Sequence, residues 1–168
     1  MSSRLSAIKR ALTLDLGEHN AAFLWGPRKV GKTSLLRQRF PKAAWYDLLD
    51  SDLRTRLLLR PACLREEVLA GRPHTVVIDE VQKVPALLDE VHGLLESTET
   101  RFILCGSSAR KLRHGAANLL GGRAWRFELF PLTTHELGVP KSAAAARQLL
   151  TRIVNHGLIP HHHLMDRP

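Results

Sequence analysis

The sequence predicts an α/β fold in which a central parallel sheet is covered by helices on both faces. Short apolar runs typical of buried strands recur along the 168 residues and alternate with segments of helical periodicity. A glycine-rich loop stands between the first of these runs and a helical segment, an arrangement that directs a helix N-terminus at an anion. The length is sufficient for one domain with a hydrophobic core.

The glycine-rich loop fits the pattern G-x-x-x-x-G-K-[ST] at every fixed position. Gly26 and Gly31 permit tight turns that bring backbone N–H groups close to a phosphate chain. Lys32 is expected to reach the β- and γ-phosphates of a nucleotide, and the Thr33 hydroxyl to ligate Mg²⁺. An ordinary glycine-rich turn is the alternative, which the flanking strand and helix disfavour. The predicted nucleotide-binding residues are Gly26, Pro27, Arg28, Lys29, Val30, Gly31, Lys32, Thr33 and Ser34.

The remaining elements follow from apolar periodicity and from glycine and proline breaks. In the first half we expect a helix at Arg4–Thr13, a strand at Ala21–Trp25, a helix at Ser34–Phe40, a strand at Trp45–Leu49, a helical or irregular connector at Asp50–Arg60 and a helix at Ala62–Ala70 that Gly71 ends. In the second half we expect strands at Thr75–Ile78, Arg101–Cys105 and Ala124–Phe130, and helices at Pro85–Ser97, 109–120 and Ala143–Asn155, of which the last ends the regular structure.

Two carboxylates directly follow the apolar run Val76-Val77-Ile78. Because open parallel sheets bind ligands at the carboxyl ends of their strands, Asp79 and Glu80 are expected beside the glycine-rich loop. Asp79 is the candidate to hold Mg²⁺, and Glu80 is the candidate base that polarises an attacking water molecule. The alternative is that these residues cap the helix that begins near Pro85.

Ser107 and four cations follow the fourth expected strand, Arg101–Cys105. From the end of that strand, the Ser107 hydroxyl would meet the γ-phosphate or the attacking water, and an ordinary serine-rich turn is the alternative. One of the cations Arg110, Lys111, Arg113 and Arg123 could stabilise charge on the transferring phosphoryl group. A solvated surface charge is the simpler interpretation for the first three. Arg123 is the strongest candidate because the turn Gly121-Gly122 precedes it. The predicted catalytic residues are Glu80, Lys32, Ser107 and Arg123, and the predicted metal ligands are Thr33 and Asp79.

The net charge of +9 favours an anionic partner. Two stretches without Asp or Glu, between His19 and Tyr46 and between Arg101 and Phe127, contain the glycine-rich loop and Ser107. A nucleotide therefore accounts for part of the basicity. Nucleic acid is a weaker candidate partner, because the sequence has no helix-turn-helix, zinc-finger or aromatic stacking pattern.

Several features predict a cytoplasmic protein. No apolar run approaches the roughly 18 residues that a membrane span needs, and the N-terminus lacks the apolar core of a secretory signal. Cys63 and Cys105 have no motif spacing and are interpreted as reduced thiols. The run His161–His163 is expected to belong to a frayed terminus, with a metal site as the alternative.

Five motifs together resemble a family of largely uncharacterised prokaryotic AAA+ ATPases: GPRKVGKTSLLRQ, VVIDEVQKVP, RFILCGSSARKL, ANLLGGRA and FELFPLT with HEL shortly after it. The resemblance covers roughly residues 5–140. It implies a three-layer P-loop core with strand order 5-1-4-3-2 and the cofactors ATP and Mg²⁺. It also implies that Asp79 is the second residue on the magnesium side, Glu80 the base, Ser107 a polar sensor and Arg123 an arginine finger that acts within the chain or on a neighbouring subunit.

The family usually continues into a nuclease-like C-terminal domain, which does not follow within these residues. We therefore expect an ATPase core at residues 1–140 and a C-terminal helix with an irregular tail at residues 141–168. Three functions stay open on the sequence: Mg²⁺-dependent ATP hydrolysis, a nucleotide-gated module that binds protein or DNA with little turnover, and a truncated inactive fragment. A protein partner or a homo-oligomer is consistent with each of the first two. The absence of a guanine-reading N-K-x-D element favours ATP over GTP.

Overall fold

Five parallel strands form a single sheet in the order β2-β3-β4-β1-β5, which confirms the predicted order 5-1-4-3-2 read from the opposite edge. The computed structural model describes residues 8–17, 20–107, 120, 122, 124–138 and 140–163, with residues 161 and 162 described by their backbone alone. The strands are β1 (Ala21–Trp25), β2 (Ala44–Asp47), β3 (Thr75–Asp79), β4 (Arg101–Gly106) and β5 (Ala124–Glu128).

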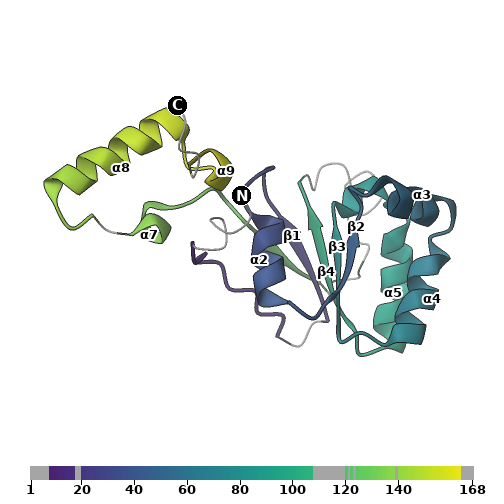
Figure 1. Ribbon diagram of the computed structural model, residues 1–168. Helices are drawn as coiled ribbons and strands as arrows, with labels where there is room; N and C mark the ends of the chain where they lie inside the picture. Colours follow the sequence, from purple (N-terminus) through teal and green to yellow (C-terminus); the bar gives the residue numbers. More distant parts are fainter. Residues whose placement is uncertain are drawn as a thin grey trace.

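Helices cover both faces of this sheet, as predicted (Figure 1). The helical elements are α2 (Lys32–Arg39), α3 (Ser51–Leu59), α4 (Ala62–Gly71), the 3₁₀ turn η1 (Val81–Lys83), α5 (Leu87–Ser97), α7 (Thr134–Leu137), α8 (Ala143–His156) and α9 (Pro160–His163). Helix α2 lies on one face of the sheet, and α3, α4 and α5 lie on the other, so the core has three layers.

Alternation along the buried strands explains why both faces hold a helix layer. On β3 and β4, Ile78 and Leu104 join the apolar cluster beneath α3, α4 and α5. Their neighbours Val77 and Ile103 join the cluster beneath α2. A strand with apolar side chains on both faces must be covered on both, which is typical of parallel sheets.

The strand register places the ends of β1, β3 and β4 at one edge of the sheet. Trp25 pairs with Gly106, and Asp79 pairs with Cys105. The loop that follows β1 and the residues that follow β3 and β4 therefore meet at this edge. That is the edge at which open parallel sheets bind their ligands.

The predicted N-terminal helix is wrong over the part of it that the structure describes. Residues 8–13 are not helical, and the chain from Ile8 to Gly17 alternates between inward and outward side chains. Leu12 and Leu14 pack against the apolar cluster under α2, and Leu16 is buried. Long-range packing overrides local helix propensity here, because an extended segment buries alternate residues and a helix would not.

Other boundaries differ by a few residues from those predicted. The second strand is earlier, at Ala44–Asp47, and α4 runs through Gly71 to a C-cap at Arg72, whose φ is 43°. The turn η1 at Val81–Lys83 precedes Pro85 and was not predicted, and α5 starts at Leu87, two residues later than expected. Of the helix predicted at 109–120, all but Leu120 lies outside the described residues.

Two short helices that were not predicted, α7 and α9, lie on either side of α8 in the C-terminal part. Helix α8 ends at His156 and is followed by the short helix α9 (Figure 1). His163 is buried in the structure, so the expectation of a frayed terminus is wrong for this residue. Its Nδ1 lies 2.9 Å from the carbonyl oxygen of Gly157, and its own carbonyl accepts a hydrogen bond from Arg152 Nε at 2.7 Å.

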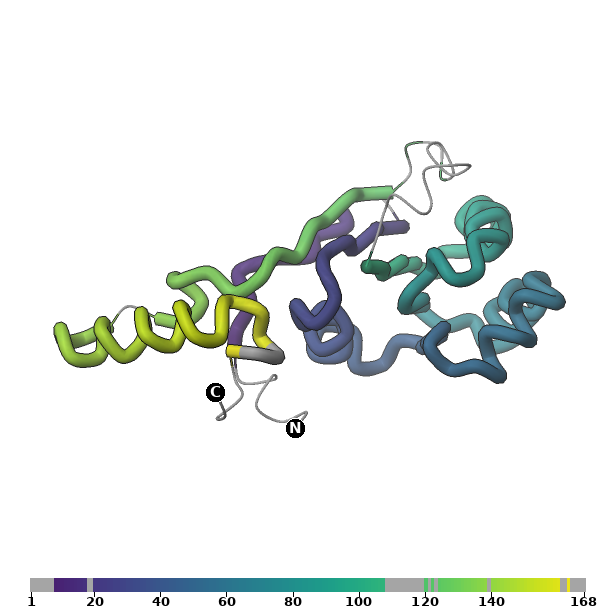
Figure 2. Tube along the Cα trace, turned by 90° about the horizontal axis from the view of Figure 1, so that it is seen from above, coloured from purple at the N-terminus to yellow at the C-terminus, as the bar shows by residue number. Residues whose placement is uncertain are grey.

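Figure 2 shows α8 beside the segment that follows β5, on the opposite side of the molecule from α3 and α4. All fourteen residues of α8 are described, and none is buried. Within the described part of the chain, no helix combines the length and the apolar character that a membrane crossing requires.

Candidate nucleotide-binding site

The glycine-rich loop leaves β1 after Trp25 and enters α2 at Lys32. Gly31 caps α2 with φ 93°, a left-handed conformation that favours glycine, and its cap contains no side-chain hydrogen bond. Lys29 also has a positive φ, of 66°. The first turn of α2 contains no acidic residue. The N–H groups at the start of a helix have no partner within the helix, so this turn can receive an anion.

Gly26 is required by close packing rather than by the turn alone. A Cβ atom at this position would lie 2.2 Å from the carbonyl oxygen of Leu129, which follows β5. Leu129 itself donates its N–H to the carbonyl of Trp25 at 2.7 Å. The loop is thus held against the backbone that leaves β5, and a side chain at Gly26 would separate the two.

The side chain of Lys32 lies inside the loop. Its Nζ donates to the carbonyl oxygens of Gly26 at 2.8 Å and Pro27 at 2.9 Å, and the residue is buried. Because an ammonium group is a compact charge with three donors, two loop carbonyls leave it one further donor for a phosphate oxygen.

Thr33 and Asp79 bring the loop and the end of β3 into direct contact. Thr33 Oγ1 donates to Asp79 Oδ2 at 2.6 Å, and Asp79 is only 3% exposed. Its other oxygen, Oδ1, accepts the N–H of Glu80 at 3.0 Å. A hydroxyl and a carboxylate are the hard oxygen donors that Mg²⁺ prefers, so these two residues fit the predicted metal.

Glu80, Gln82 and Ser107 form a hydrogen-bonded triangle next to this pair. Glu80 Oε2 accepts from Ser107 Oγ at 3.1 Å and also from Gln82 Nε2. The same Nε2 group donates to Ser107 Oγ at 3.2 Å. The N-cap of α5 is Ala86, with no side-chain capping bond, so the alternative that Asp79 and Glu80 cap the helix near Pro85 is not supported. Gln82 was not predicted, although its position two residues after Glu80 in the DEVQ motif was a signal.

Arg123 and the other three candidate cations, Arg110, Lys111 and Arg113, lie outside the described residues. Their predicted role therefore stays a prediction. Cys105, opposite Asp79, is buried and free. Burial and the nearby Asp79 carboxylate raise the pKa of its thiol well above the usual value.

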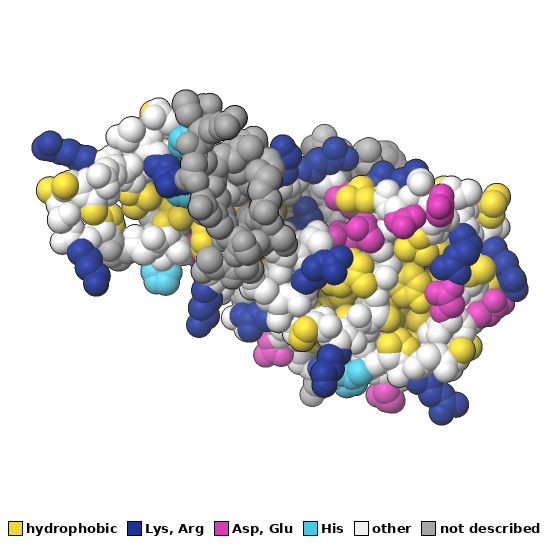
Figure 3. All heavy atoms as spheres, viewed as in Figure 1, with side chains coloured by type: hydrophobic (Ala, Val, Ile, Leu, Met, Phe, Trp, Pro, Cys, Tyr) yellow, Lys and Arg dark blue, Asp and Glu magenta, His cyan; other side chains and the backbone are white. Residues whose placement is uncertain are grey.

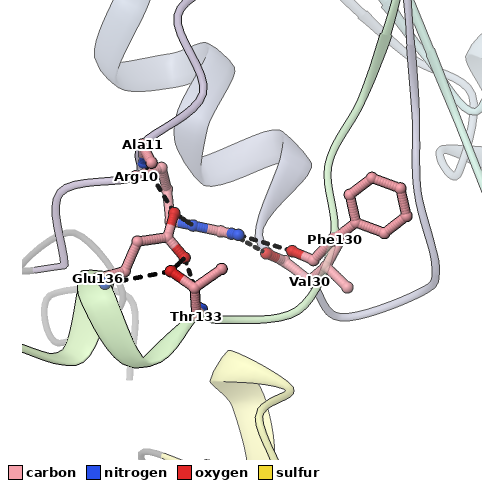
Figure 4. Close-up of polar contacts among 6 residues, drawn as sticks. All are labelled: Arg10, Ala11, Val30, Phe130, Thr133 and Glu136. Atoms are coloured by element: carbon pink, nitrogen blue, oxygen red, sulfur yellow. Dashed lines mark hydrogen bonds and ion pairs between the residues drawn. The ribbon is translucent and has the colours of Figure 1, made fainter.

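A buried ion pair that was not predicted from the sequence contacts the glycine-rich loop (Figure 4). Arg10 Nε donates to Glu136 Oε1 at 2.9 Å, and its two terminal nitrogens donate to the carbonyls of Val30 and Phe130, each at 2.6 Å. Arg10 and Glu136 have side chains only 8% and 4% exposed. The guanidinium thus joins the N-terminal segment, the glycine-rich loop and the segment after β5.

Glu136 is fully engaged by hydrogen-bond donors. It also accepts the N–H groups of Ala11 at 2.7 Å and Thr133 at 2.9 Å. Burial alone raises the pKa of Glu136, but the donors of Ala11, Thr133 and Arg10 outweigh burial and hold this pKa below its usual value. Thr133 and Glu136 also form a capping box at the start of α7.

A small cavity lies beside the loop at the start of α2. Its lining combines the N-terminal segment, the loop, α2 and the segments after β5, and includes Ile8, Val30, Ser34, Gln38, Leu132 and Pro160. With a volume of about 10 Å³, the cavity has room for about one water molecule and is too small for an organic ligand. Among the described residues, no three His, Cys, Asp or Glu side chains are grouped closely enough to form a metal cluster.

Comparisons with known proteins agree with this arrangement. Residues 18–138 match the model of a family described as an AAA domain. Two curated relatives, uncharacterised proteins of Mycobacterium bovis and Mycobacterium tuberculosis, are each 33% identical over 129 residues, which is 74% of this chain and 27% of the relative. The chain thus spans about a quarter of their length. A Walker-type ATPase of Pyrococcus abyssi has a similar fold, with a TM-score of 0.58, 16% identity and coverage of 85% of this chain and 60% of that one.

Proposed function

This chain belongs to the AAA domain family of P-loop ATPases. From that premise we propose that it binds ATP with Mg²⁺ and hydrolyses the bond between the β- and γ-phosphates. The observation that carries the proposal is the 2.6 Å contact between Thr33 and Asp79. This contact joins the phosphate-binding loop to the strand end that presents Glu80. A glycine-rich turn without a catalytic role would not need a buried carboxylate at that position.

The residues have distinct roles in the proposed reaction. Backbone N–H groups of the loop and Lys32 bind the β- and γ-phosphate oxygens, and Thr33 and Asp79 hold the metal. Bound Mg²⁺ supplies positive charge that offsets the negative charge of the phosphates. Glu80 orients the attacking water and accepts its proton, and the hydroxyl of Ser107 contacts the γ-phosphate or that water. Catalysis of this kind rests mainly on positioning and electrostatic stabilisation.

The preference for ATP over GTP rests on the sequence. The sequence has no guanine-reading N-K-x-D element. We propose Arg123 as the residue that stabilises charge on the transferred phosphoryl group, either in this chain or in a neighbouring subunit.

Glu80→Gln tests the hydrolytic step. The variant keeps the shape of the side chain and removes the basic carboxylate. We expect the dissociation constant for Mg²⁺-ATP to stay within about twofold, and kcat for phosphate release to fall by about 10²- to 10⁴-fold, the usual worth of a general base. The exposed Glu66→Gln on α4 is the matched control and should leave both quantities unchanged. Hydrolysis at the parent rate by Glu80→Gln would exclude Glu80 as the base.

A second candidate is a nucleotide-gated module with little turnover, and the exposed apolar side chains of α8 favour it. Leu150 is 60% exposed and Val154 is 81% exposed, which suits a protein contact. Nucleic acid is less well supported, because Lys and Arg side chains on the face in Figure 3 are spread out rather than gathered into one patch. Duplex binding that is unchanged between low and physiological salt would exclude contacts to phosphates.

A further inference from the structure

We propose that Gln82 is a positioning residue for ATP hydrolysis, because its side-chain amide fixes the Glu80 carboxylate in the orientation that receives the attacking water. The inference rests on the proposed function and adds to it a residue that the motif assignment does not include. Gln82 is the middle residue of η1, which follows Glu80 directly.

The amide nitrogen of Gln82 uses its two protons within the triangle described above. One proton is donated to Glu80 Oε2, and the other to Ser107 Oγ at 3.2 Å. The bond to Glu80 has a charged acceptor, and bonds of this type are about twice as strong as neutral ones. Both donors are therefore directed at the two side chains that are expected to meet the water and the γ-phosphate.

The amide oxygen of Gln82 shows that this orientation is enforced by its surroundings. Gln82 Oε1 is buried and has no hydrogen-bond partner among the described residues. A buried acceptor without a partner is unfavourable. Rotating the amide by 180° would direct the oxygen at the Glu80 carboxylate, which has no proton to donate when it is ionised. The unpartnered oxygen is thus a consequence of using the nitrogen to hold Glu80.

The Gln82 amide lies close against Gly106. A Cβ atom on Gly106 would lie 2.3 Å from Gln82 Oε1 and 2.6 Å from the ring of Trp25. Glycine at the end of β4 therefore leaves the space that the Gln82 amide occupies. Glu80 has φ 57°, an uncommon backbone conformation for this residue type that turns the chain sharply into η1.

Gln82 becomes more important when Ser107 engages the nucleotide. The Ser107 hydroxyl has one proton, which in this structure is donated to Glu80 Oε2. If Ser107 donates that proton to a γ-phosphate oxygen, it no longer donates to Glu80. Among the described residues, Gln82 Nε2 is then the remaining side-chain donor to the Glu80 carboxylate. The amide then holds one carboxylate oxygen, and the other oxygen is left for the water.

The test is a double-mutant cycle with Gln82→Met and Glu80→Gln. Gln82→Met keeps the length of the side chain and removes both donors. With Glu80 present, we expect it to lower kcat by about 10- to 100-fold, as loss of a residue that orients a functional group does, with the dissociation constant for Mg²⁺-ATP within about twofold. In the Glu80→Gln background it should lower kcat by less than about twofold, because it acts through Glu80. Multiplicative losses, or a loss confined to ATP binding, would overturn the proposal.

The matched control is Gln148→Met on α8, where the glutamine is exposed. It makes the same chemical change away from the site and should alter neither kcat nor binding. The melting temperature of each variant is measured alongside, so that a folding defect in Gln82→Met is seen. If that variant fails to fold, Gln82→Leu, which also removes both donors and adds no charge, replaces it in the same cycle with the same expected and contradicting results.

A measurement without turnover separates this proposal from the proposed function. In the nucleotide-free protein, the side-chain amide protons of Gln82 should exchange with solvent at least about tenfold more slowly than those of Gln148, and Glu80→Ala should remove most of that difference. Absence of hydrolysis by a folded, ATP-binding parent would refute the proposed function, yet slow exchange would still establish that Gln82 holds Glu80. Equal exchange rates for the two amides would overturn the contact itself.

Discussion

Glu136→Gln should destabilise the protein far more than its position in a short surface helix suggests. The Glu136 carboxylate accepts hydrogen bonds from Arg10, Ala11 and Thr133, and its side chain is 4% exposed. Glutamine has the same shape but replaces one acceptor oxygen with an NH₂ donor. At least one of the existing donors would then face another donor, and the Arg10 guanidinium would stay buried without its counter-charge.

The magnitude follows from the burial of the pair. Removing one partner of a buried ion pair costs about 3–5 kcal/mol, and glutamine keeps one acceptor, so we expect about 3 kcal/mol. A change of 1 kcal/mol shifts the melting temperature of a chain of this size by about 2–4 °C, which predicts a decrease of about 6–12 °C. The exposed pair Arg60–Glu66, with side chains 65% and 52% exposed, supplies the control Glu66→Gln. That variant should cost less than about 1 kcal/mol.

The assay is urea unfolding of parent, Glu136→Gln and Glu66→Gln at several pH values. The pKa of Glu136 is lower in the folded protein than its usual value, so its carboxylate stabilises the fold above the pKa of the unfolded chain. The difference in the free energy of unfolding between parent and Glu136→Gln should reach its full value at pH 7 and should shrink as the pH falls below about 4. Equal destabilisation by the two variants at pH 7, or a difference independent of pH, would refute this account of the pair.

Two further predictions use matched pairs of variants. Gly26→Ala should weaken Mg²⁺-ATP binding by more than about tenfold in a fluorescence titration, because the new Cβ would lie 2.2 Å from the Leu129 carbonyl oxygen. Gly93→Ala, whose Cβ would have no atom within 4 Å, is the control and should bind Mg²⁺-ATP normally. Equal affinities of the two variants would contradict the role of the contact with Leu129. Leu57→Ala should lower the free energy of unfolding in urea by about 2–5 kcal/mol, and Leu59→Ala by less than about 0.5 kcal/mol, because these residues of α3 are 0% and 83% exposed. Similar losses for the two variants would show that α3 does not pack as described.

The parts of the site that could be predicted are those encoded in a few consecutive residues. Gly26, Lys32 and Thr33 belong to one motif, and the apolar run before Asp79 marks the end of a buried strand. Parallel strands share an edge, so the meeting of Thr33 with Asp79 follows from the fold class. The roles of these residues in hydrolysis, and that of Arg123, stay predictions.

The parts that could not be predicted depend on contacts between distant residues. Arg10 and Glu136 are 126 positions apart, and nothing local to either residue indicates the other. Leu5, Ile8 and Leu12 have the spacing of one face of a helix, whereas Leu12, Leu14 and Leu16 alternate as an extended segment does. Local spacing was ambiguous there, and packing against the cluster under α2 decided the conformation.

Thermal unfolding of the parent and of Lys32→Ala, each with and without Mg²⁺-ATP, tests the central claim most directly. At about 100 times its dissociation constant, a ligand should stabilise the folded state by about 2.7 kcal/mol, which corresponds to roughly 5–11 °C for a chain of this size. Our account predicts this increase for the parent and its loss in Lys32→Ala, whose ammonium group lies inside the loop. A parent that unfolds cooperatively with no increase, or an increase that Lys32→Ala retains, would contradict nucleotide binding at this loop.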